Sequence, residues 1–523
     1  MQPVLLKSAG PIIRKIRLQD HLEIEAQEGE TLLSALGRAG IPISAPCGGR
    51  HNCGKCKVKI LKGQVRNILS DKGSQEFAQG EVLSCASIPV TDLDIALITE
   101  HTYDGGVYEE ISRDIAVKKP KRAAVALDIG TTTISARLVD SDTGEELGTY
   151  SALNRQKIYG ADIMSRISAA REGKTKELFD IINRQTEEIL NGFMEKFELS
   201  SIETLIVSAN TTMLHLFVNE DPSAMGVIPF SPVFLDEREY NGTALSLSVN
   251  KVFLIPSISA FIGGDIVSGL TEISILDAKE SVFFIDIGTN GEMALFHQGK
   301  LLTASAAAGP ALEGAEISCG VGSIRGAINK LQFQDGSIHW ETIGGDTAVG
   351  ICGCGLIDAI ALMLEKNIIE ETGAFTDDDL EEFIIIPESS FNSKISISNR
   401  DVRQYQLAKS AILSAIKILC KKAELGLEDI KKVYVAGGLG FYLDQKSAIK
   451  SGLLPYEFYN RIEVRGNTSL KGAIKAILEP DFFDYCKQIK IKSEVIDLAS
   501  DPEFMDAFAE NMIFDEGLIC LTI

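Results

Sequence analysis

The chain has 523 residues, of which 45% are hydrophobic and 24% charged, and its formal net charge is −22. This length and composition predict an ordinary folded protein of roughly three or four domains. The acidic balance argues against general nucleic-acid binding, which needs a basic face to meet phosphates. No apolar run approaches the roughly 18 residues of a membrane span, and the N-terminus lacks a secretory signal, so we expect a cytoplasmic protein with no membrane partner.

The first expected domain, residues 1–95, surrounds a glycine-rich cysteine loop. Cys47, Cys53 and Cys56 stand in APCGGRHNCGKCKVKI, and Cys85 follows in EVLSCASIPV. Three thiolates from one loop and a fourth from a distant segment suit a 2Fe–2S cluster, whereas zinc more often takes paired C-x2-C knuckles. The expected strands IRKIRLQ, LEIEAQ, CKVKILKGQV and LDIALI, with the helix TLLSALGRAGI, give the element order of a small β-grasp ferredoxin. The sequence therefore predicts an N-terminal 2Fe–2S domain.

Charge is unevenly spread between this domain and the rest of the chain. Residues 1–95 hold 12 Lys and Arg against 10 Asp and Glu, a net of +2, so the remaining chain carries −24. The cations near the cysteine loop are Arg50, Lys55, Lys57, Lys59 and Lys62. They form either a solvated basic strand or a docking face for an acidic redox partner. Because four cysteines suffice for a cluster, we expect His51 to be an exposed loop residue.

A linker is expected over residues 96–121, which show no clean periodicity and end in KKPKR. It would let the ferredoxin domain move between an electron source and an acceptor.

After the linker, one motif occurs twice. In AAVALDIGTTTISARL a strand ends at Asp128 and a turn contains Gly130, Thr131 and Thr132. In SVFFIDIGTNGEMALF the equivalent residues are Asp286, Gly288, Thr289 and Asn290. Glycine permits a tight turn whose amides face phosphate, Thr and Asn add donors, and the carboxylates can hold hydrated Mg²⁺. Two such turns facing each other predict a site for a triphosphate.

Two further segments extend this expected nucleotide site. In KKVYVAGGLGFYLD a strand runs into Gly437 and Gly438, and glycines there would let an adenosine lie against the backbone. Asp265, in IGGDIVSG, lies between the two phosphate turns in sequence. It is a candidate catalytic residue that orients a water, and the alternative is a helix N-cap.

Three other residues receive structural interpretations. His215, in TTMLHLF, is expected to be a core histidine, with a contact to a partner's cofactor as the alternative. Cys352 and Cys354, in GICGCGLID, are too close in sequence for an unstrained disulfide, so we expect small residues at a turn entering a helix.

The ordered set DIGTTT, DIGTNGE and VAGGLG resembles the acetate and sugar kinase, heat-shock chaperone and actin superfamily of ATPases. Together with the ferredoxin domain, it looks like the reductive activators of corrinoid enzymes, over nearly the whole chain. Other stretches that match are NRQKIYGADIMSRI (154–167), PFSPVF (229–234) and DVRQYQLAKSAI (401–412). Some members of that family carry a middle domain before the ATPase, but DIGTTT follows the linker so closely that we expect none here.

The resemblance implies an α/β multidomain fold in which a β-grasp ferredoxin domain precedes two ribonuclease-H-like lobes of an actin-like ATPase. The implied division is a ferredoxin domain (1–95), a linker (96–121), ATPase lobe I (122–280), lobe II (281–480) and a C-terminal segment packing on the ATPase (481–523).

The resemblance also implies the function: ATP-dependent, one-electron reduction of Co(II) to Co(I) in the corrinoid protein of a methyltransferase system. The implied cofactors are a 2Fe–2S cluster, ATP and Mg²⁺, and the partners are the corrinoid protein and an unidentified electron donor, with homodimer formation left open. The alternatives are an ATP-driven electron donor to a non-corrinoid enzyme, a metabolite kinase with a redox sensor, and a chaperone-like ATPase with a structural cluster.

Overall fold

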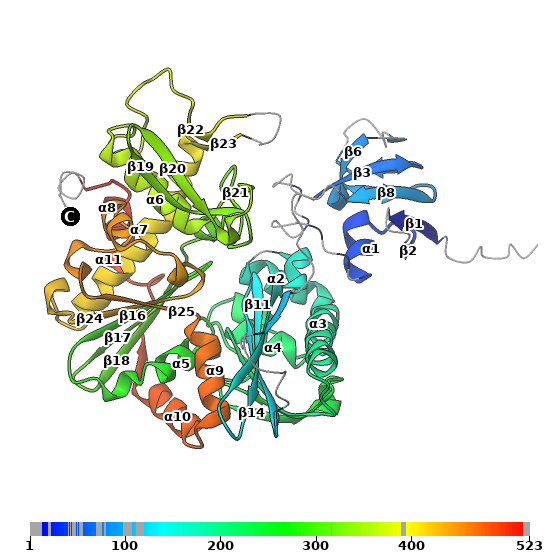
Figure 1. Ribbon diagram of the computed structural model, residues 1–523, viewed down its shortest axis with the longest axis horizontal. Helices are drawn as coiled ribbons and strands as arrows, with labels where there is room; N and C mark the ends of the chain where they lie inside the picture. The colour runs from blue at the N-terminus through cyan, green and yellow to red at the C-terminus, as the bar shows by residue number, and fades with distance from the viewer. Residues whose placement is uncertain are drawn as a thin grey trace, which may run out of the picture.

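The computed structural model describes residues 13–18, 22–39, 41, 43, 49, 51, 56–69, 76–77, 80–97, 107–110, 120–160, 162–314, 316–388 and 394–515. A small N-terminal domain lies beside two larger lobes, each built on its own sheet (Figure 1). We call the part with the seven-stranded sheet lobe I and the part with the six-stranded sheet lobe II.

The N-terminal domain has the expected β-grasp plan. Its main sheet has the order β2-β1-β8-β3-β6 and contains β1 (Arg14–Leu18), β2 (Glu23–Ala26), β3 (Lys57–Lys62), β6 (Gly80–Leu83) and β8 (Leu93–Leu97). A smaller sheet contains β4 (Val65–Asn67), β5 (Glu76–Phe77) and β7 (Ser87–Pro89). The central strands β1 and β8 are parallel, and helix α1 (Leu32–Arg38) packs its leucines into the domain core.

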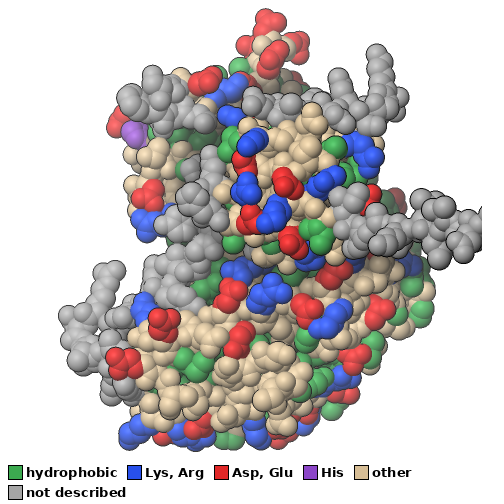
Figure 2. Space-filling model, turned by 90° about the vertical axis from the view of Figure 1, so that its right-hand side faces the viewer, with side chains coloured by type: hydrophobic (Ala, Val, Ile, Leu, Met, Phe, Trp, Pro, Cys, Tyr) green, Lys and Arg blue, Asp and Glu red, His purple; other side chains and the backbone are tan. Residues whose placement is uncertain are grey.

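The outward face of this domain carries charges of both signs. Lys15 and Arg17 on β1 pair with Glu23 on β2, and Lys57 on β3 pairs with Glu81 on β6. On the side of the molecule seen in Figure 2, Lys and Arg side chains are interspersed with Asp and Glu. The described part of this face therefore has no large field of one sign.

Lobe I is a seven-stranded sheet of order β14-β15-β13-β10-β11-β12-β9. Its strands are β9 (Val107–Glu110), β10 (Ala123–Ile129), β11 (Thr133–Asp140), β12 (Glu146–Leu153), β13 (Ile202–Ala209), β14 (Arg238–Asn241) and β15 (Val249–Leu254). Its helices are α2 (Ile163–Ala169), α3 (Thr175–Lys196), α4 (Thr211–Phe217) and α5 (Gly264–Glu272). Strand β9 comes from the stretch expected to be a linker, and it pairs antiparallel with β12.

Lobe II repeats the central plan of lobe I in the order β25-β24-β16-β17-β18-β26. Its strands are β16 (Val282–Ile287), β17 (Gly291–His297), β18 (Lys300–Ala306), β24 (Lys432–Ala436), β25 (Ile462–Gly466) and β26 (Ser493–Val495). Its helices are α6 (Gly353–Glu365), α7 (Asn399–Lys422), α8 (Gln445–Lys450) and α9 (Thr468–Leu478). Separate small sheets hold β19 (Ala327–Gln334), β20 (Ser337–Thr342), β21 (Gly350–Ile351), β22 (Glu382–Ile386) and β23 (Ile395–Ser398).

The C-terminal segment packs on lobe II. It contains α10 (Phe482–Lys492), β26, which pairs parallel with β18, and α11 (Pro502–Glu510), which contacts α7. The buried ammonium group of Lys409 on α7 donates to the Asn511 and Ile513 carbonyls, each at 2.8 Å. Gln406 donates to the Met512 carbonyl at 2.9 Å, so side chains of α7 satisfy the last carbonyls of the segment.

Helices α5 and α9 pack against each other between the two large sheets (Figure 1). Helix α9 comes from lobe II but also contacts β10 and β13 of lobe I. It therefore ties the two lobes together at the point where the repeated turns meet. Within the described ranges, no helix combines the length and the apolar character needed to cross a membrane.

Candidate functional site

The two repeated turns occupy equivalent places in the two lobes. Asp128 is the penultimate residue of β10, and Asp286 is the penultimate residue of β16. Each strand pairs antiparallel with the next strand of the chain and parallel with a later one, β13 or β24. The polar turns therefore leave their sheets at the same position, as their sequence similarity predicts.

The Asp128 carboxylate is held by side chains from the opposite lobe. Its two oxygens accept hydrogen bonds from the Asn467 amide and the Ser469 hydroxyl, both at 2.7 Å. Asn467 is also the N-cap of α9, since its side-chain oxygen accepts from the Leu470 amide. Burial raises the pKa of Asp128, and these two donors oppose the shift. Asp128 thus connects strand β10 to helix α9.

The Asp286 carboxylate has a different environment. Within the described residues, no group donates a hydrogen bond to it, and burial together with the nearby Asp265 and Asp128 raises its pKa to about 8. Burial and Asp128 raise the pKa of Asp265 to about 7. Glu292, directly opposite Asp286 on β17, has a pKa well above its usual value, first because of burial and then because of Asp265 and Asp286.

Asp265 is not the N-cap of α5, so that alternative is wrong. The N-cap is Gly263, and the Asp265 carboxylate accepts from the Ile266 amide at 2.9 Å. Its place beside Asp128 and Asp286 keeps it a candidate for orienting a water.

Glu313, in the segment after β18, bridges the two turns and was not identified from the sequence. Its Oε2 accepts hydrogen bonds from the Thr132 hydroxyl of lobe I, at 3.0 Å, and from the Thr289 hydroxyl of lobe II. Burial raises the pKa of Glu313, and these hydroxyls partly offset the shift. The sequence around it, GPALEGAEISCG (residues 309–320), does not indicate a contact with a residue 181 positions away.

The glycines of the site differ in how much space a side chain would have at each position. A Cβ at Gly130 would lie 2.6 Å from the Thr133 carbonyl oxygen, whereas one at Gly288 would meet nothing closer than 3.6 Å. Gly437 has a φ of +89°, and a Cβ there would lie 2.4 Å from Asp286 Oδ1. Gly438 follows with no heavy atom within 4 Å of a Cβ position. A side chain at Gly438 would therefore meet no neighbour, whereas one at Gly437 would collide with Asp286.

These residues fit a magnesium nucleotide. Burial raises the pKa of five carboxyl groups here (Asp128, Asp265, Asp286, Glu292 and Glu313), and Asp286 lies near Asp265, Asp128 and Glu313, so a nearby cation would stabilise their charged forms. In the described part of the chain, no three His, Cys, Asp or Glu side chains are grouped so that they could hold a metal ion. In nucleotide sites Mg²⁺ keeps waters and takes one or two carboxylates together with phosphate oxygens.

Two of the four cysteines in the expected cluster site are described. Cys56, just before β3, and Cys85, in the turn η1 (Ser84–Ala86), are buried with their Sγ atoms 3.2 Å apart. Chiefly because of its contact with Cys85, the pKa of the Cys56 thiol is lowered to about 5, which favours the thiolate that ligates iron. The neighbouring Ser84 hydroxyl also contributes to lowering this pKa, so it can donate to sulfur, and the Ser87 hydroxyl is buried with no hydrogen-bond partner among the described residues. Cys47 and Cys53 lie outside the described residues.

His51 is not the exposed loop residue that we expected. It is half-buried with a φ of +64°, and its Nδ1 lies 3.2 Å from Cys85 Sγ. His51 therefore lies beside Cys85, where it could tune a cluster, and the prediction of an exposed side chain is wrong.

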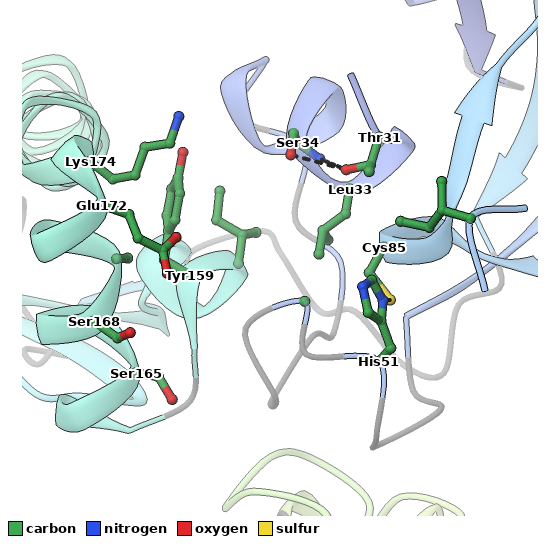
Figure 3. A pocket seen from close by; sticks show the side chains of 14 residues that line it. Thr31, Leu33, Ser34, His51, Cys85, Tyr159, Ser165, Ser168, Glu172 and Lys174 are labelled. Atoms are coloured by element: carbon green, nitrogen blue, oxygen red, sulfur yellow. Dashed lines mark hydrogen bonds between the residues drawn. The ribbon is translucent and has the colours of Figure 1, made fainter. Parts of the chain in front are cut away.

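A cavity of about 320 Å³ separates this cysteine pair from lobe I (Figure 3). The N-terminal domain contributes Thr31, Ser34, His51 and Cys85 to its wall. Lobe I contributes residues from η2 (Arg155–Tyr159), α2 and the following turn, including Tyr159, Ser165, Ser168 and Lys174.

The remaining candidates lie in the core. His215 is fully buried, with Nδ1 2.7 Å from the Thr211 carbonyl and Nε2 accepting from the Val233 amide at 3.0 Å. Cys352 and Cys354 are buried at the start of α6, as the turn interpretation predicts.

Three family models match successive parts of the chain. Residues 16–90 match the 2Fe-2S iron–sulfur cluster binding domain, residues 123–277 the RACo middle region, and residues 280–518 the C-terminal domain of RACo, the ASKHA domain. The first match confirms the iron–sulfur domain, and the last confirms the actin-like ATPase fold with its nucleotide. We expected no middle domain before the ATPase. These family models divide the chain differently: the part that they call the RACo middle region, residues 123–277, is the lobe that carries DIGTTT, so the expectation that no middle domain is present is wrong under their division.

Similar proteins cover nearly the same length. The corrinoid activation enzyme RamQ of Eubacterium limosum is 27% identical over 584 residues, covering 95% of this chain and 98% of that protein. The [Co(II) methylated amine-specific corrinoid protein] reductase of Methanosarcina barkeri is 28% identical over 417 residues, covering 73% and 75%. The solved structure of a reductive activator for corrinoid, iron–sulfur protein is 29% identical with a TM-score of 0.71, covering 97% and 99%.

Proposed function

The chain belongs to the RACo family, and from this membership we propose that it reduces the Co(II) corrinoid of a partner protein to Co(I) in an ATP-dependent cycle. The observation that carries the proposal is that one chain matches both the 2Fe–2S domain and the ASKHA domain, with its two repeated turns joined through Glu313. When bound, the cluster supplies one electron per Co(II), which an external low-potential donor must replace, and MgATP supplies binding energy that differs between conformations.

The protein's own residues have the following proposed roles. Cys47, Cys53, Cys56 and Cys85 hold the cluster, and His51 and the Ser84 hydroxyl lie where they can tune it. The triphosphate lies between Thr131 and Thr132 on one side and Thr289 and Asn290 on the other, with adenosine near Gly437 and Gly438. Gly130 and Gly288 shape the two turns.

Asp286, which accepts no hydrogen bond from the described residues, is the proposed primary contact of the hydrated Mg²⁺. Asp265 lies near it and orients a water. Asp128 couples the turn of lobe I to the position of lobe II, because its carboxylate accepts hydrogen bonds from Asn467 and Ser469 of lobe II. Glu313 sets the spacing of the two turns through Thr132 and Thr289.

We also propose the division of labour expected from the sequence. Residues 1–95 carry electrons, and residues 96–121 connect them to the ATPase. Lobes I and II (122–280 and 281–480) bind nucleotide, and residues 481–523 pack on the ATPase. A cytoplasmic location and a low-potential protein as electron donor belong to the same proposal, and homodimer formation stays open.

The test is an anaerobic absorbance time course. Chemically reduced protein is mixed with a purified Co(II) corrinoid protein from the same organism, with and without MgATP, and the Co(I) band is followed. We expect Co(I) only with MgATP, loss of the signal in Cys53→Ser, and an unchanged signal in Cys319→Ser, whose half-buried thiol donates to the Ser396 carbonyl. If several corrinoid proteins give no Co(I) although the cluster is reduced, the protein donates electrons to a different enzyme.

A further inference from the structure

The N-terminal domain contacts lobe I through one close apolar pair. Gly37 on α1 and Ile158 on η2 are both buried, and a Cβ at position 37 would lie 2.4 Å from Ile158 Cδ1. Beside this pair, Arg38 and Glu177 lie close enough to affect each other's pKa. We call residues 155–174 of lobe I, on which α1 rests, the ferredoxin seat.

The seat covers the side of the N-terminal domain that carries Cys85. Cys85 is only 3% exposed, and together with His51 it faces α2 of lobe I across the cavity (Figure 3). A volume of about 320 Å³ holds roughly ten waters at liquid density. A second protein carrying a corrinoid is far larger than this cavity, so it cannot reach Cys85 from the side that faces lobe I while the ferredoxin domain rests on the seat.

The seat is joined to the nucleotide turn by Arg166. This residue of α2 is fully buried, and its guanidinium group donates to the Thr131 carbonyl in the DIGTTT turn and to the Gly160 carbonyl at 3.2 Å. Gly160 directly follows η2, and Ser165 and Ser168, on the same helix as Arg166, line the cavity. A single side chain therefore links the phosphate-binding turn to the surface beneath the ferredoxin domain.

The charge of Arg166 is not paired within the described residues. Its hydrogen bonds go to two carbonyls, to Gln156 Oε1 at 3.4 Å and to Met213 Sδ at 3.1 Å, and no carboxylate accepts from it. Asp162 and Glu313 lie near enough to act on its charge, but neither accepts a hydrogen bond from it. Because a buried guanidinium that no carboxylate contacts directly is costly, a nucleotide phosphate beside Thr131 would attract it. Any movement toward the phosphate weakens the bonds to Gly160 and Gln156.

The seat also has a place where it can bend. The helix is interrupted between α2 and α3 by a π-helical turn, Ala170–Lys174, and Gly173 within it has a φ of +84°. Nothing lies within 4 Å of a Cβ at Gly173. Such interruptions often mark functional hinges, and this one allows α2 to shift while α3 stays packed on the sheet.

We propose that the ferredoxin domain alternates between this seat, where its Cys85 side is covered, and a released position, and that nucleotide at the Thr131 turn releases it through Arg166. The inference rests on the proposed function in one respect, because reduction of a partner's corrinoid requires the Cys85 side to be uncovered. Arg166 acts here as a positioning residue and does not take part in the chemistry.

The test is a cross-link across the seat in the full-length protein. In Gly37→Cys/Ile158→Cys the two Cβ atoms are placed 3.7 Å apart, inside the ~3.5–4.5 Å range of disulfides. The variant is treated anaerobically with oxidised glutathione, and the linked peptide is followed over time by mass spectrometry. We expect the link to form, and a non-hydrolysable MgATP analogue to slow it by about fivefold or more.

In the Arg166→Met background we expect the link to form with no response to the analogue. Loss of the guanidinium should weaken binding of the analogue, so the comparison is made at analogue concentrations that calorimetry shows to be saturating for this variant. Arg166→Lys keeps the charge and should restore part of the response, and it also serves if Arg166→Met does not fold. The matched control is Arg155→Met, which removes an arginine of η2 that pairs with Glu188 at 2.7 Å and not with the turn.

Three results would contradict the inference. Absence of the linked peptide, with both cysteines reactive, means that the seat is not occupied, and an unchanged rate with bound analogue means that nucleotide does not act on it. A normal response in Arg166→Met removes the role of Arg166. None of these readouts uses a corrinoid protein, so a failed Co(I) assay leaves this test intact.

Discussion

The turn at Asp128 and the turn at Asp286 have nearly the same sequence and the same position in their sheets, but their carboxylates have different surroundings. Asp128 accepts two hydrogen bonds of 2.7 Å from Asn467 and Ser469 of the opposite lobe. Asp286 accepts none from the described residues, and burial with Asp265 and Asp128 raises its pKa to about 8. One local motif thus serves as an inter-lobe contact in lobe I and as a candidate cation contact in lobe II.

The difference arises because the donors to Asp128 come from the N-terminal end of helix α9 of the other lobe. The N-terminus of α9 reaches β10, whereas the corresponding space beside β16 is bounded by Gly437, which has no side chain to donate. A motif repeated in the sequence therefore does not imply a repeated role, and substitutions at the two aspartates should separate the roles.

The largest effect is expected for Asp286→Asn. Loss of its charge should weaken MgATP binding or hydrolysis by roughly 10- to 100-fold, the range typical of residues that orient a metal's ligands. The same variant should melt at a higher temperature without nucleotide, because a buried carboxylate without donors has been removed. Steady-state ATPase rates and thermal melts measure both. A variant with normal ATPase activity would exclude Asp286 as the cation contact.

Asp128→Asn should lower the stability of the nucleotide-free protein, whereas Asp286→Asn should raise it. The new amide faces the Asn467 amide and the Ser469 hydroxyl, and the loss of an acceptor for these buried donors should cost about 1–3 kcal/mol of unfolding free energy. Denaturant titration of the nucleotide-free protein gives this value, and Ser469→Ala serves as the single-bond comparison. Equal stability of Asp128→Asn and the unmodified protein would contradict the inter-lobe role.

The raised pKa values predict a pH dependence. Asp286 and Asp265 keep their protons in the folded protein up to about pH 8 and 7, whereas in the unfolded chain they ionise near pH 4. The unfolded chain therefore binds fewer protons between these values, and stability should fall as pH rises through this window. MgATP should oppose the fall and bind more tightly as pH rises, since cation binding displaces protons. Melting curves from pH 5 to about 8.5 test this, and Asp286→Asn should flatten the slope.

The smallest effects are expected at the paired glycines. Gly437→Ala puts a side chain on a residue with a positive φ beside Asp286. This should lower the free energy of unfolding by about 1–2 kcal/mol. Gly438→Ala meets open space and should leave stability within about 0.5 kcal/mol. If adenosine lies over Gly438, the second variant should weaken nucleotide binding by about 1 kcal/mol, a few-fold in Kd, as calorimetry would measure. Unchanged affinity in Gly438→Ala would place the adenosine elsewhere.

Much of the architecture was predictable because it depends on local patterns. Strands β10 and β16 are apolar runs that end in a polar turn, and the spacing of Cys47, Cys53 and Cys56 is a property of one loop. Such patterns predict backbone conformation and burial, because both depend largely on residues that are close together in the sequence. They were enough to predict the β-grasp domain, the two repeated lobes and the two phosphate turns.

The partners of those turns could not be predicted in the same way. Glu313 reaches Thr132 from 181 residues away, and Asn467 reaches Asp128 from 339 residues away. Arg166 appeared only as one letter of a family-like stretch, and its contact with Thr131 depends on how α2 packs beside the turn. His51 was expected to be exposed for the same reason, since its neighbour Cys85 comes from another segment.

The sequence by itself therefore determined which elements form and which residue types can meet phosphate and iron, because those properties follow from backbone preferences and side-chain chemistry over a few residues. Only the tertiary structure decided which carboxylate accepts hydrogen bonds from the opposite lobe, which one has no donor among the described residues, and on which surface of lobe I the ferredoxin domain rests. These outcomes depend on the burial and approach of segments far apart in the chain, and burial is what sets the energy of each charge.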